Sequence, residues 1–269
     1  MAEQLQWENK MTLDWVELRK VMYPTRTYED LRKKWRDSIA YACVRKAYNL
    51  SMPEMADYTR RILGEDSKNR YTEWLATLTV TFERLEKAGI KDVLDLIREA
   101  DTLENLEGFI ARSGMDAKEV VGCLFYMMYW FLTMKKYLQS LVKNNPLIQQ
   151  DIQKLYAAGI RFNLDLLEKG ATPEGRKEIA RAVGLPEDAV TGLVNRADFS
   201  RLPWASAATV SNIIGTGYGS LAKLANADPE KLHADFFLYG AAIGKDLRFG
   251  NEIDSSYRIA QFVPKVVVD

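Results

Sequence analysis

The sequence contains few of the residues on which most catalytic and metal sites depend. Its 269 residues include one histidine, His233, and two cysteines, Cys43 and Cys123. A histidine-rich metal site is therefore excluded, and any Ser-His-Asp or Cys-His mechanism would have to use His233, beside which no nucleophile motif occurs. The two cysteines form no CxxC, so we expect neither a disulfide framework nor a cysteine zinc site. We assign no catalytic residue and expect no metal and no cofactor.

The chain also lacks a charge excess and a long apolar run. Lysine plus arginine equals aspartate plus glutamate, 37 of each, whereas proteins dedicated to nucleic acid usually carry a basic excess. The most apolar run, residues 120–134, is shorter than the roughly 20 residues of a membrane-spanning helix. The opening residues "MAEQLQWENK" show no basic region followed by an apolar one, as a secretion signal would. These features predict a cytoplasmic protein that does not enter a membrane.

The apolar residues that are present recur with the period of a helix. Hydrophobic residues make up 47% of the chain, enough for a sizeable core. Residues 27–50, 51–64 and 69–89 carry apolar side chains at spacings of three and four, and Gly64 and Gly89 end two of these segments. No set of alternating strands with hairpin turns occurs. We therefore predict an all-α fold, with a short extended tail around Pro264 and the valines that follow it.

Glycines punctuate these helices at matching positions. "LEKAGIKDVLDLI" and "LYAAGIRFNLDLL" are similar, and Gly89 and Gly159 stand as far apart in the chain as Gly114 and Gly184. A third copy places Gly217, in "NIIGTGYGSLAKLA", at the equivalent position. The spacing indicates an internal repeat in which glycine supplies the positive φ of a turn. A nucleotide-phosphate loop fits less well, because the stretch is GxGxG and not GxGxxG.

The segment "LYAAGIRFNLDLLEKGATPEGRKEIARAVGLPEDAVTGLVNRADFSRL", with "SLAKLANADPEKLHADF" after it, resembles a family of uncharacterised proteins. Their domain contains tandem helix-hairpin-helix-like units, and the resemblance covers residues 151–237. It implies short helices joined by glycine turns, without a catalytic mechanism. Helix-hairpin-helix units often bind nucleic acid through backbone N–H groups. After "VNRADFSRL", however, this chain has "PWASAAT" in place of a Gly-apolar-Gly triplet, which puts phosphate binding in doubt.

We expect three regions along the chain. Residues 1–80 are an amino-terminal helical region, residues 81–145 a diverged helix-hairpin-helix-like repeat with an aromatic core helix, and residues 146–269 helix-hairpin-helix-like repeats plus the tail. Within the second region, residues 123–138 are apolar around the whole circumference, which predicts a buried helix. An alternative is that their aromatic and methionine side chains line a pocket or a subunit contact.

Two segments are candidate sites. In the first, basic residues alternate with aromatic ones, which suits phosphate contact with base stacking, or equally an ordinary helix with its aromatics inward. Its candidate residues are Arg26, Arg32, Lys33, Lys34, Trp35, Arg36, Arg45 and Lys46. The second is a polar, irregular segment near the carboxyl end, interpreted as a binding loop or a solvated one. Its candidate residues are Arg248, Asn251, Glu252, Asp254 and Tyr257.

The sequence leaves three classes of function open. The first is a non-catalytic binding or scaffold protein that engages a macromolecule through helical faces, with a protein partner or self-association. The alternative is sequence-independent binding of nucleic acid through the basic segment or a surviving hairpin. A third is an enzyme with an unrecognised pocket in the aromatic middle region.

Overall fold

The computed structural model describes residues 13–64, 72–142, 145–203, 205–247 and 251–268. Throughout these ranges the regular elements are helices, which confirms the all-α fold. Extended pairing is limited, in the same ranges, to two isolated bridges, Ser51 with Asp92 and Tyr137 with Phe162. None of the described helices has the length and apolarity needed to cross a membrane.

The chain forms two compact units. The first contains the described residues up to Arg36 and residues 49–128. Its helices are α1 (Trp15–Met22), the part of α2 (Tyr28–Ile39) up to Arg36, α4 (Met52–Gly64), α5 (Thr72–Lys87), α6 (Val93–Glu99), α7 (Leu103–Ser113) and α8 (Ala117–Tyr126).

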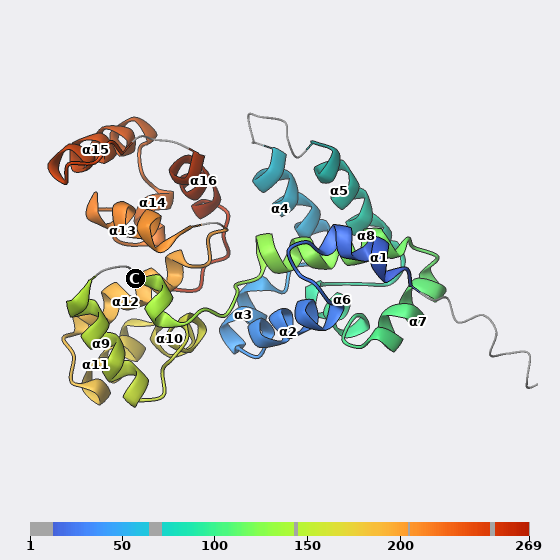
Figure 1. Cartoon of the computed structure of the whole chain (residues 1–269), viewed down its shortest axis with the longest axis horizontal. Helices are drawn as coiled ribbons and strands as arrows, with labels where there is room; N and C mark the ends of the chain where they lie inside the picture. Colours follow the sequence, from blue (N-terminus) through green and yellow to red (C-terminus); the bar gives the residue numbers. More distant parts are fainter. Residues whose placement is uncertain (1–12, 65–71, 143–144, 204, 248–250, 269) are drawn as a thin grey trace, which may run out of the picture. The chain divides into compact units, whose positions relative to one another are not determined.

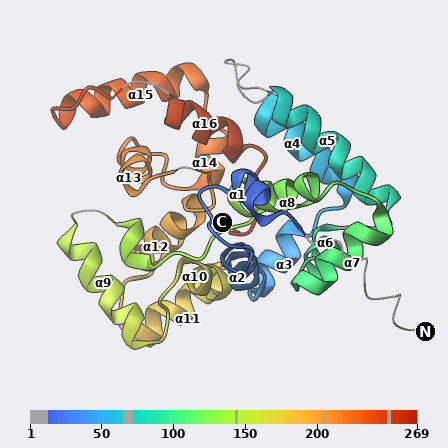
Figure 2. The same cartoon turned by 45° about the vertical axis from the view of Figure 1, so that its right-hand side comes forward.

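Packing in the first unit centres on three helices. α4 and α5 lie side by side, and α1 and α5 both pack on α8 (Figures 1 and 2). The fully buried Met55, Phe82 and Leu124 come from α4, α5 and α8, respectively. Each lies on the apolar stripe of its helix, so burial of these stripes holds the unit together.

The second unit contains residues 37–48 and the chain from residue 129 onward. Its elements are the rest of α2, α3 (Ala42–Tyr48), most of the π-helical turn η1 (Met127–Phe131), the 3-10 turn η2 (Leu138–Leu141), α9 (Pro146–Ala157), α10 (Asn163–Gly170), α11 (Pro173–Val183), α12 (Glu187–Phe199), α13 (Ala207–Gly215), α14 (Leu221–Ala225), α15 (Pro229–Ala242) and α16 (Asn251–Ala260). α10 packs against both α11 and α12, and α14 packs against α16.

Glycines with positive φ stand between the helices. Gly89, Gly159 and Gly217 have φ values of 92°, 78° and 96°. Gly114 and Gly184 both have a φ of 65° and end α7 and α11 in the left-handed conformation. An added Cβ would meet no neighbouring atom within 4 Å at any of the five, so their backbone conformation, and not crowding, favours glycine.

The glycine-rich stretch "NIIGTGYGS" is confirmed as a turn between helices. Gly215 is the last residue of α13, and Gly217 supplies the left-handed turn that leads to α14. A Cβ on Gly215 would lie 2.2 Å from the Tyr239 ring, so this glycine permits close packing of α15. Ser220 then caps α14 by accepting a hydrogen bond from the Lys223 N–H.

The expectation of one continuous aromatic helix over residues 123–138 is wrong, although its burial is confirmed for most of the segment. α8 ends at Tyr126 and is followed by the π-helical turn to Phe131. Beyond it the backbone pairs with a distant segment: Asn163 N donates to Lys136 O, and Lys136 N donates to Asn163 Oδ1. These long-range hydrogen bonds replace those of a helix. The buried members of the segment include Cys123, Leu124, Tyr126, Met127, Met128, Trp130 and Phe131.

The carboxyl-terminal segment is more regular than expected. The interpretation of residues 251–260 as irregular is wrong, because they form α16. Ile253, Ser256, Ile259 and Ala260 are buried, a helical period that the polar residues between them obscured. The extended tail is confirmed for residues 264–268, which have no helix.

Candidate interaction surface

The structure divides the basic segment between the two units. Arg26 to Arg36 belong to the first unit, and Arg45 and Lys46 to the second. Arg36 forms hydrogen bonds of 2.6 Å from Nε and Nη2 to the two carboxylate oxygens of Asp101. Arg32 donates a hydrogen bond to the backbone O of Asp101. These two guanidinium groups therefore hold the fold of the first unit.

The remaining candidates of this segment differ in exposure. Trp35 is 1% exposed, so its ring is not accessible for stacking on a base. Arg45 donates to the backbone oxygens of Ile39 and Ala40, capping the end of α2. Arg26, Lys33 and Lys46 are exposed, and Lys34 is half-buried. Tyr28 and Tyr48 are buried like Trp35, as in an ordinary helix with its aromatic residues inward, whereas Tyr23 is exposed.

In two of the glycine turns, an aspartate carboxylate of the same chain accepts hydrogen bonds from backbone N–H groups. After Gly159, the N–H groups of Arg161 and Phe162 donate to Asp165 Oδ2 at 2.8 and 2.9 Å. After Gly89, the N–H of Lys91 donates to Asp95 Oδ2 at 3.3 Å. An external phosphate would need these same donors. Asp165 therefore satisfies both amides of its turn from within, and Asp95 satisfies one amide of the equivalent turn.

The third turn differs from these two. Lys223 stands where Asp95 and Asp165 stand relative to the preceding turn glycine, and its side chain is exposed. Within the described chain, the N–H groups of Gly219 and Ser220 have no hydrogen-bond acceptor. Tyr218 is held beside this turn by a 2.7 Å hydrogen bond from its hydroxyl to Asp235.

A cleft of about 640 Å³ lies along the carboxyl-terminal tail in the second unit. Its walls come from α12, α14 and the tail itself, and include Asp198, Arg201 and Leu221. Of the predicted tail site, Asp254 and Tyr257 lie on α16 and are half-buried, and Asp254 forms an ion pair with Arg258 at 3.4 Å. Arg248 and the side chains of Asn251 and Glu252 lie outside the described residues.

Two buried arginines hold the tail. Arg201 forms an ion pair with Asp198 at 2.7 Å and donates to the Tyr48 hydroxyl and to Pro264 O, both at 2.7 Å. Arg176 donates to Val268 O at 2.9 Å. Because buried charges require paired and hydrogen-bonded surroundings, these contacts fix the path of residues 264–268.

Cys43 should be nearly inert to alkylation in the folded protein. Burial and a hydrogen bond to Glu168 raise the pKa of its thiol to about 12, so its reactive thiolate is about a thousandfold scarcer than in a free cysteine. Burial also raises the pKa of Cys123. Mass spectrometry after iodoacetamide treatment at about pH 8 should show both thiols unmodified in the native protein and modified in urea. Rapid alkylation of Cys43 in the native protein would contradict a buried thiol whose pKa is raised.

α15 has apolar side chains on two opposite faces. Leu232, Phe236 and Gly240 are buried against the second unit. Ala234, Phe237, Leu238 and Ala241 recur at the spacing of one helical face on the opposite side, and all four are exposed. Phe237 and Leu238 are 62% and 65% exposed. An exposed apolar face of this kind is a candidate interaction surface. These four residues are called the α15 face below.

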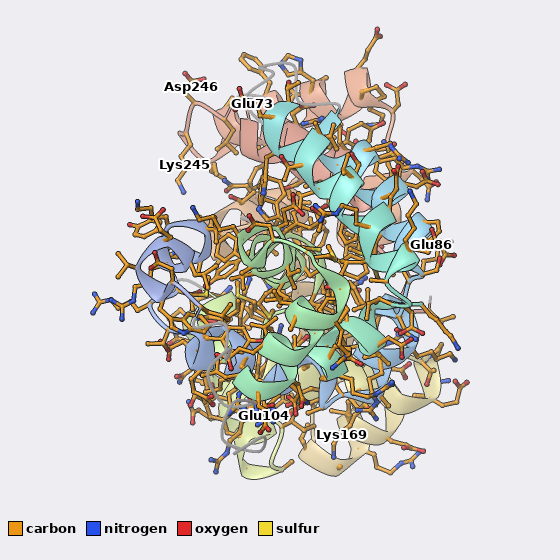
Figure 3. The ribbon with its side chains drawn as sticks, turned by 90° about the vertical axis from the view of Figure 1, so that its right-hand side faces the viewer. Glu73, Glu86, Glu104, Lys169, Lys245 and Asp246 are labelled. Atoms are coloured by element: carbon orange, nitrogen blue, oxygen red, sulfur yellow. The ribbon has the colours of Figure 1, made fainter. Side chains whose placement is uncertain are left out.

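Charged residues stand before and after the apolar part of α15. Glu230 stands in the first turn of the helix. Beyond the other end the chain turns back through Gly244, and Lys245 N donates to Gly240 O at 2.8 Å. Figure 3 shows the side chains of Lys245 and Asp246 pointing away from the ribbon.

Sequence reasoning missed the α15 face and the arginines that hold the tail. The signal for the face was the "ADFFLYGAA" stretch, in which apolar residues surround the helix on all sides. The signal for the tail contacts was Asp198 and Arg201 within "VNRADFSRL", three positions apart and able to meet on one helical face.

Comparisons with known proteins point to one segment of the chain. Residues 145–237 match a family described as a domain of unknown function, DUF4332. No curated protein matches the chain. No solved structure matches it either. The segment from α9 into α15 is thus similar to this uncharacterised family.

Proposed function

We propose that this protein is a non-catalytic binding or scaffold protein that engages a protein partner through the α15 face. The observation that carries this proposal is the exposure of Phe237 and Leu238 on a helix whose other side is already buried. Burial of such side chains on association supplies most of the binding energy of protein interfaces. No catalytic step is needed for a surface of this kind to act.

The proposal includes the finer architecture, in which tandem helix-hairpin-helix-like units present this surface. Three stretches of the chain, α5 to α8, α9 to α12 and α13 to α16, have the same order of elements. Each contains two consecutive pairs of helices, and a glycine with positive φ stands between the two helices of each pair. The third stretch ends with Gly244, at a φ of 66°, and α16. α15 is then the third helix of the third stretch.

A capture experiment tests the proposed function. Tagged full-length protein, incubated with nuclease-treated lysate of its native cells, should retain a specific protein that mass spectrometry identifies. Replacing Phe237 and Leu238 with lysine should reduce its recovery at least about tenfold, because a charge cannot be buried unpaired. Val80, 52% exposed on α5, provides the matched control as Val80→Lys. Equal recovery by all three proteins would contradict the proposal.

The alternative of nucleic-acid binding rests on the third turn. It predicts retention on heparin at low salt that falls steeply as salt rises, and loss of retention in Lys223→Asp, which restores the acidic residue of the other two turns. Absence of retention at low salt would remove this alternative. The enzyme alternative gains no support from the aromatic middle segment, whose Tyr126, Met128 and Phe131 are buried in the core.

A further inference from the structure

A small cavity of about 240 Å³ in the second unit is lined by α9, α12, α13 and the turn that follows α13. It shares no lining residue with the larger cleft along the tail. Most of its wall is apolar, formed by Ile148, Ala189, Leu193 and Ile214. Pockets for drug-sized molecules measure roughly 300–1,000 Å³, so this cavity suits a smaller ligand.

A glycine on α12 leaves this space open. Ala189, Gly192, Leu193 and Arg196 line the cavity and recur at spacings of three and four, which places them on one face of the helix. Gly192 contributes no side chain, and a Cβ added there would meet no atom within 4 Å. A larger residue at this position would therefore fill the cavity without disturbing its surroundings.

Two opposite charges line the cavity without pairing with each other. Asp151 of α9 and Arg196 of α12 are both half-buried, and among the described residues neither has an ion-pair partner. Arg196 donates to Ser211 Oγ at 3.1 Å. Burial lowers the pKa of Arg196, whereas the hydrogen-bonded Asp101 carboxylate raises the pKa of Arg36. The guanidinium group of Arg196 is thus partly desolvated without a compensating anion.

Gly219 adds a backbone donor to the same cavity. It is a lining residue, and its N–H has no acceptor within the described chain. A guanidinium group and a free N–H are donors for a carboxylate, and the Asp151 carboxylate is an acceptor for an ammonium group. The cavity therefore offers partners for both charges of one molecule, together with an apolar wall.

We propose that this cavity binds a small zwitterion with an apolar side chain, the class of molecule to which leucine and other aliphatic α-amino acids belong. The carboxylate of the ligand meets Arg196 and the Gly219 N–H, its ammonium group meets Asp151, and its side chain lies against Ile148 and Ile214. A ligand of so few atoms has a dissociation constant of roughly 0.1–10 mM. This site is independent of the α15 face, because no residue of α15 lines the cavity.

NMR titration of the isotope-labelled, full-length protein with L-leucine tests this site. The amide resonances of Gly192 and Gly219 should shift along a saturating curve. Isocaproate lacks the ammonium group of leucine, and isoamylamine lacks its carboxylate. Each analogue should bind at least about tenfold more weakly, because one charge of the cavity then stays unpaired. Binding of either analogue as tightly as leucine would overturn the proposal of a zwitterion.

Variants of the lining residues locate the site. Gly192→Leu fills the cavity and leaves both charges in place, so it should abolish the leucine-dependent shifts, whereas Gly192→Ala should still bind. Arg196→Met and Asp151→Asn should each weaken binding at least about tenfold. Arg181→Met and Glu187→Gln, at exposed positions of α11 and α12, are the matched controls and should bind leucine like the wild type. Circular dichroism checks that each variant is folded.

The outcomes for the wild type and Gly192→Leu decide the question even if a charge variant does not fold. Absence of leucine-dependent shifts in the wild type, or unchanged leucine binding by Gly192→Leu, overturns the cavity as a binding site. Shifts that Gly192→Leu abolishes, and that require both charges of the ligand, support it.

Discussion

Replacing Gly175 with alanine should lower the free energy of unfolding by about 3 kcal/mol or more. A Cβ at this position would lie 2.0 Å from the backbone O of Lys169 and 3.1 Å from its carbonyl carbon. Because the obstacle is backbone, no change of rotamer relieves the contact, and the junction between α10 and α11 must open. Urea denaturation followed by circular dichroism measures the change.

Gly192→Ala is the matched control for this substitution. Gly192 lies in the interior of α12, and an added Cβ would meet no atom within 4 Å. Alanine loses less backbone entropy than glycine when a helix forms, so this variant should gain roughly 0.5–1 kcal/mol. The two variants make the same chemical change with opposite expected signs. An unchanged unfolding midpoint for Gly175→Ala would contradict the close approach of the two helices.

Replacing Arg201 with methionine should destabilise the protein by about 3–5 kcal/mol. The side chains of Arg201 and Asp198 are 3% and 7% exposed, so the substitution leaves a carboxylate buried without its cationic partner. The same change removes the hydrogen bond to Pro264 O. Hydrogen exchange of the Val266 to Val268 amides should therefore increase, while that of α4 and α5 should not.

A double variant separates the two effects of Arg201. Asp198→Leu combined with Arg201→Met removes both charges, so it should recover much of the stability lost in the single variant. The tail should still exchange faster, since its hydrogen bond to Arg201 remains absent. If the double variant is less stable than Arg201→Met, the buried carboxylate is not the source of the loss.

The sequence predicts the helices and glycine turns because their causes are local. A positive φ is costly for every residue except glycine, so Gly89, Gly159 and Gly217 can be recognised by spacing alone. The burial of Leu31 and Trp35, four positions apart on α2, likewise follows from helical period. Such features depend on residues within a few positions of one another.

The features that the sequence does not predict depend on distant partners. Beyond the aromatic segment, Lys136 pairs with the distant Asn163 instead of continuing a helix, and neither glycine nor proline marks this change. The role of Arg36 on α2 depends on Asp101, which lies in the connection between α6 and α7. Which side of α15 is buried also depends on tertiary packing, because both of its faces are apolar. Local pattern alone therefore could not identify the surface proposed for binding.

The carboxylate of Asp165 competes with external anions for the backbone amides of its own turn. It accepts hydrogen bonds from two amides of the turn and from the Tyr41 hydroxyl. Any anion that arrives from solution must displace a group that is tethered a few residues away, at an effective concentration of roughly millimolar or more. The turn thus discriminates against dilute anions of every kind, and it does so without a lid or a conformational change.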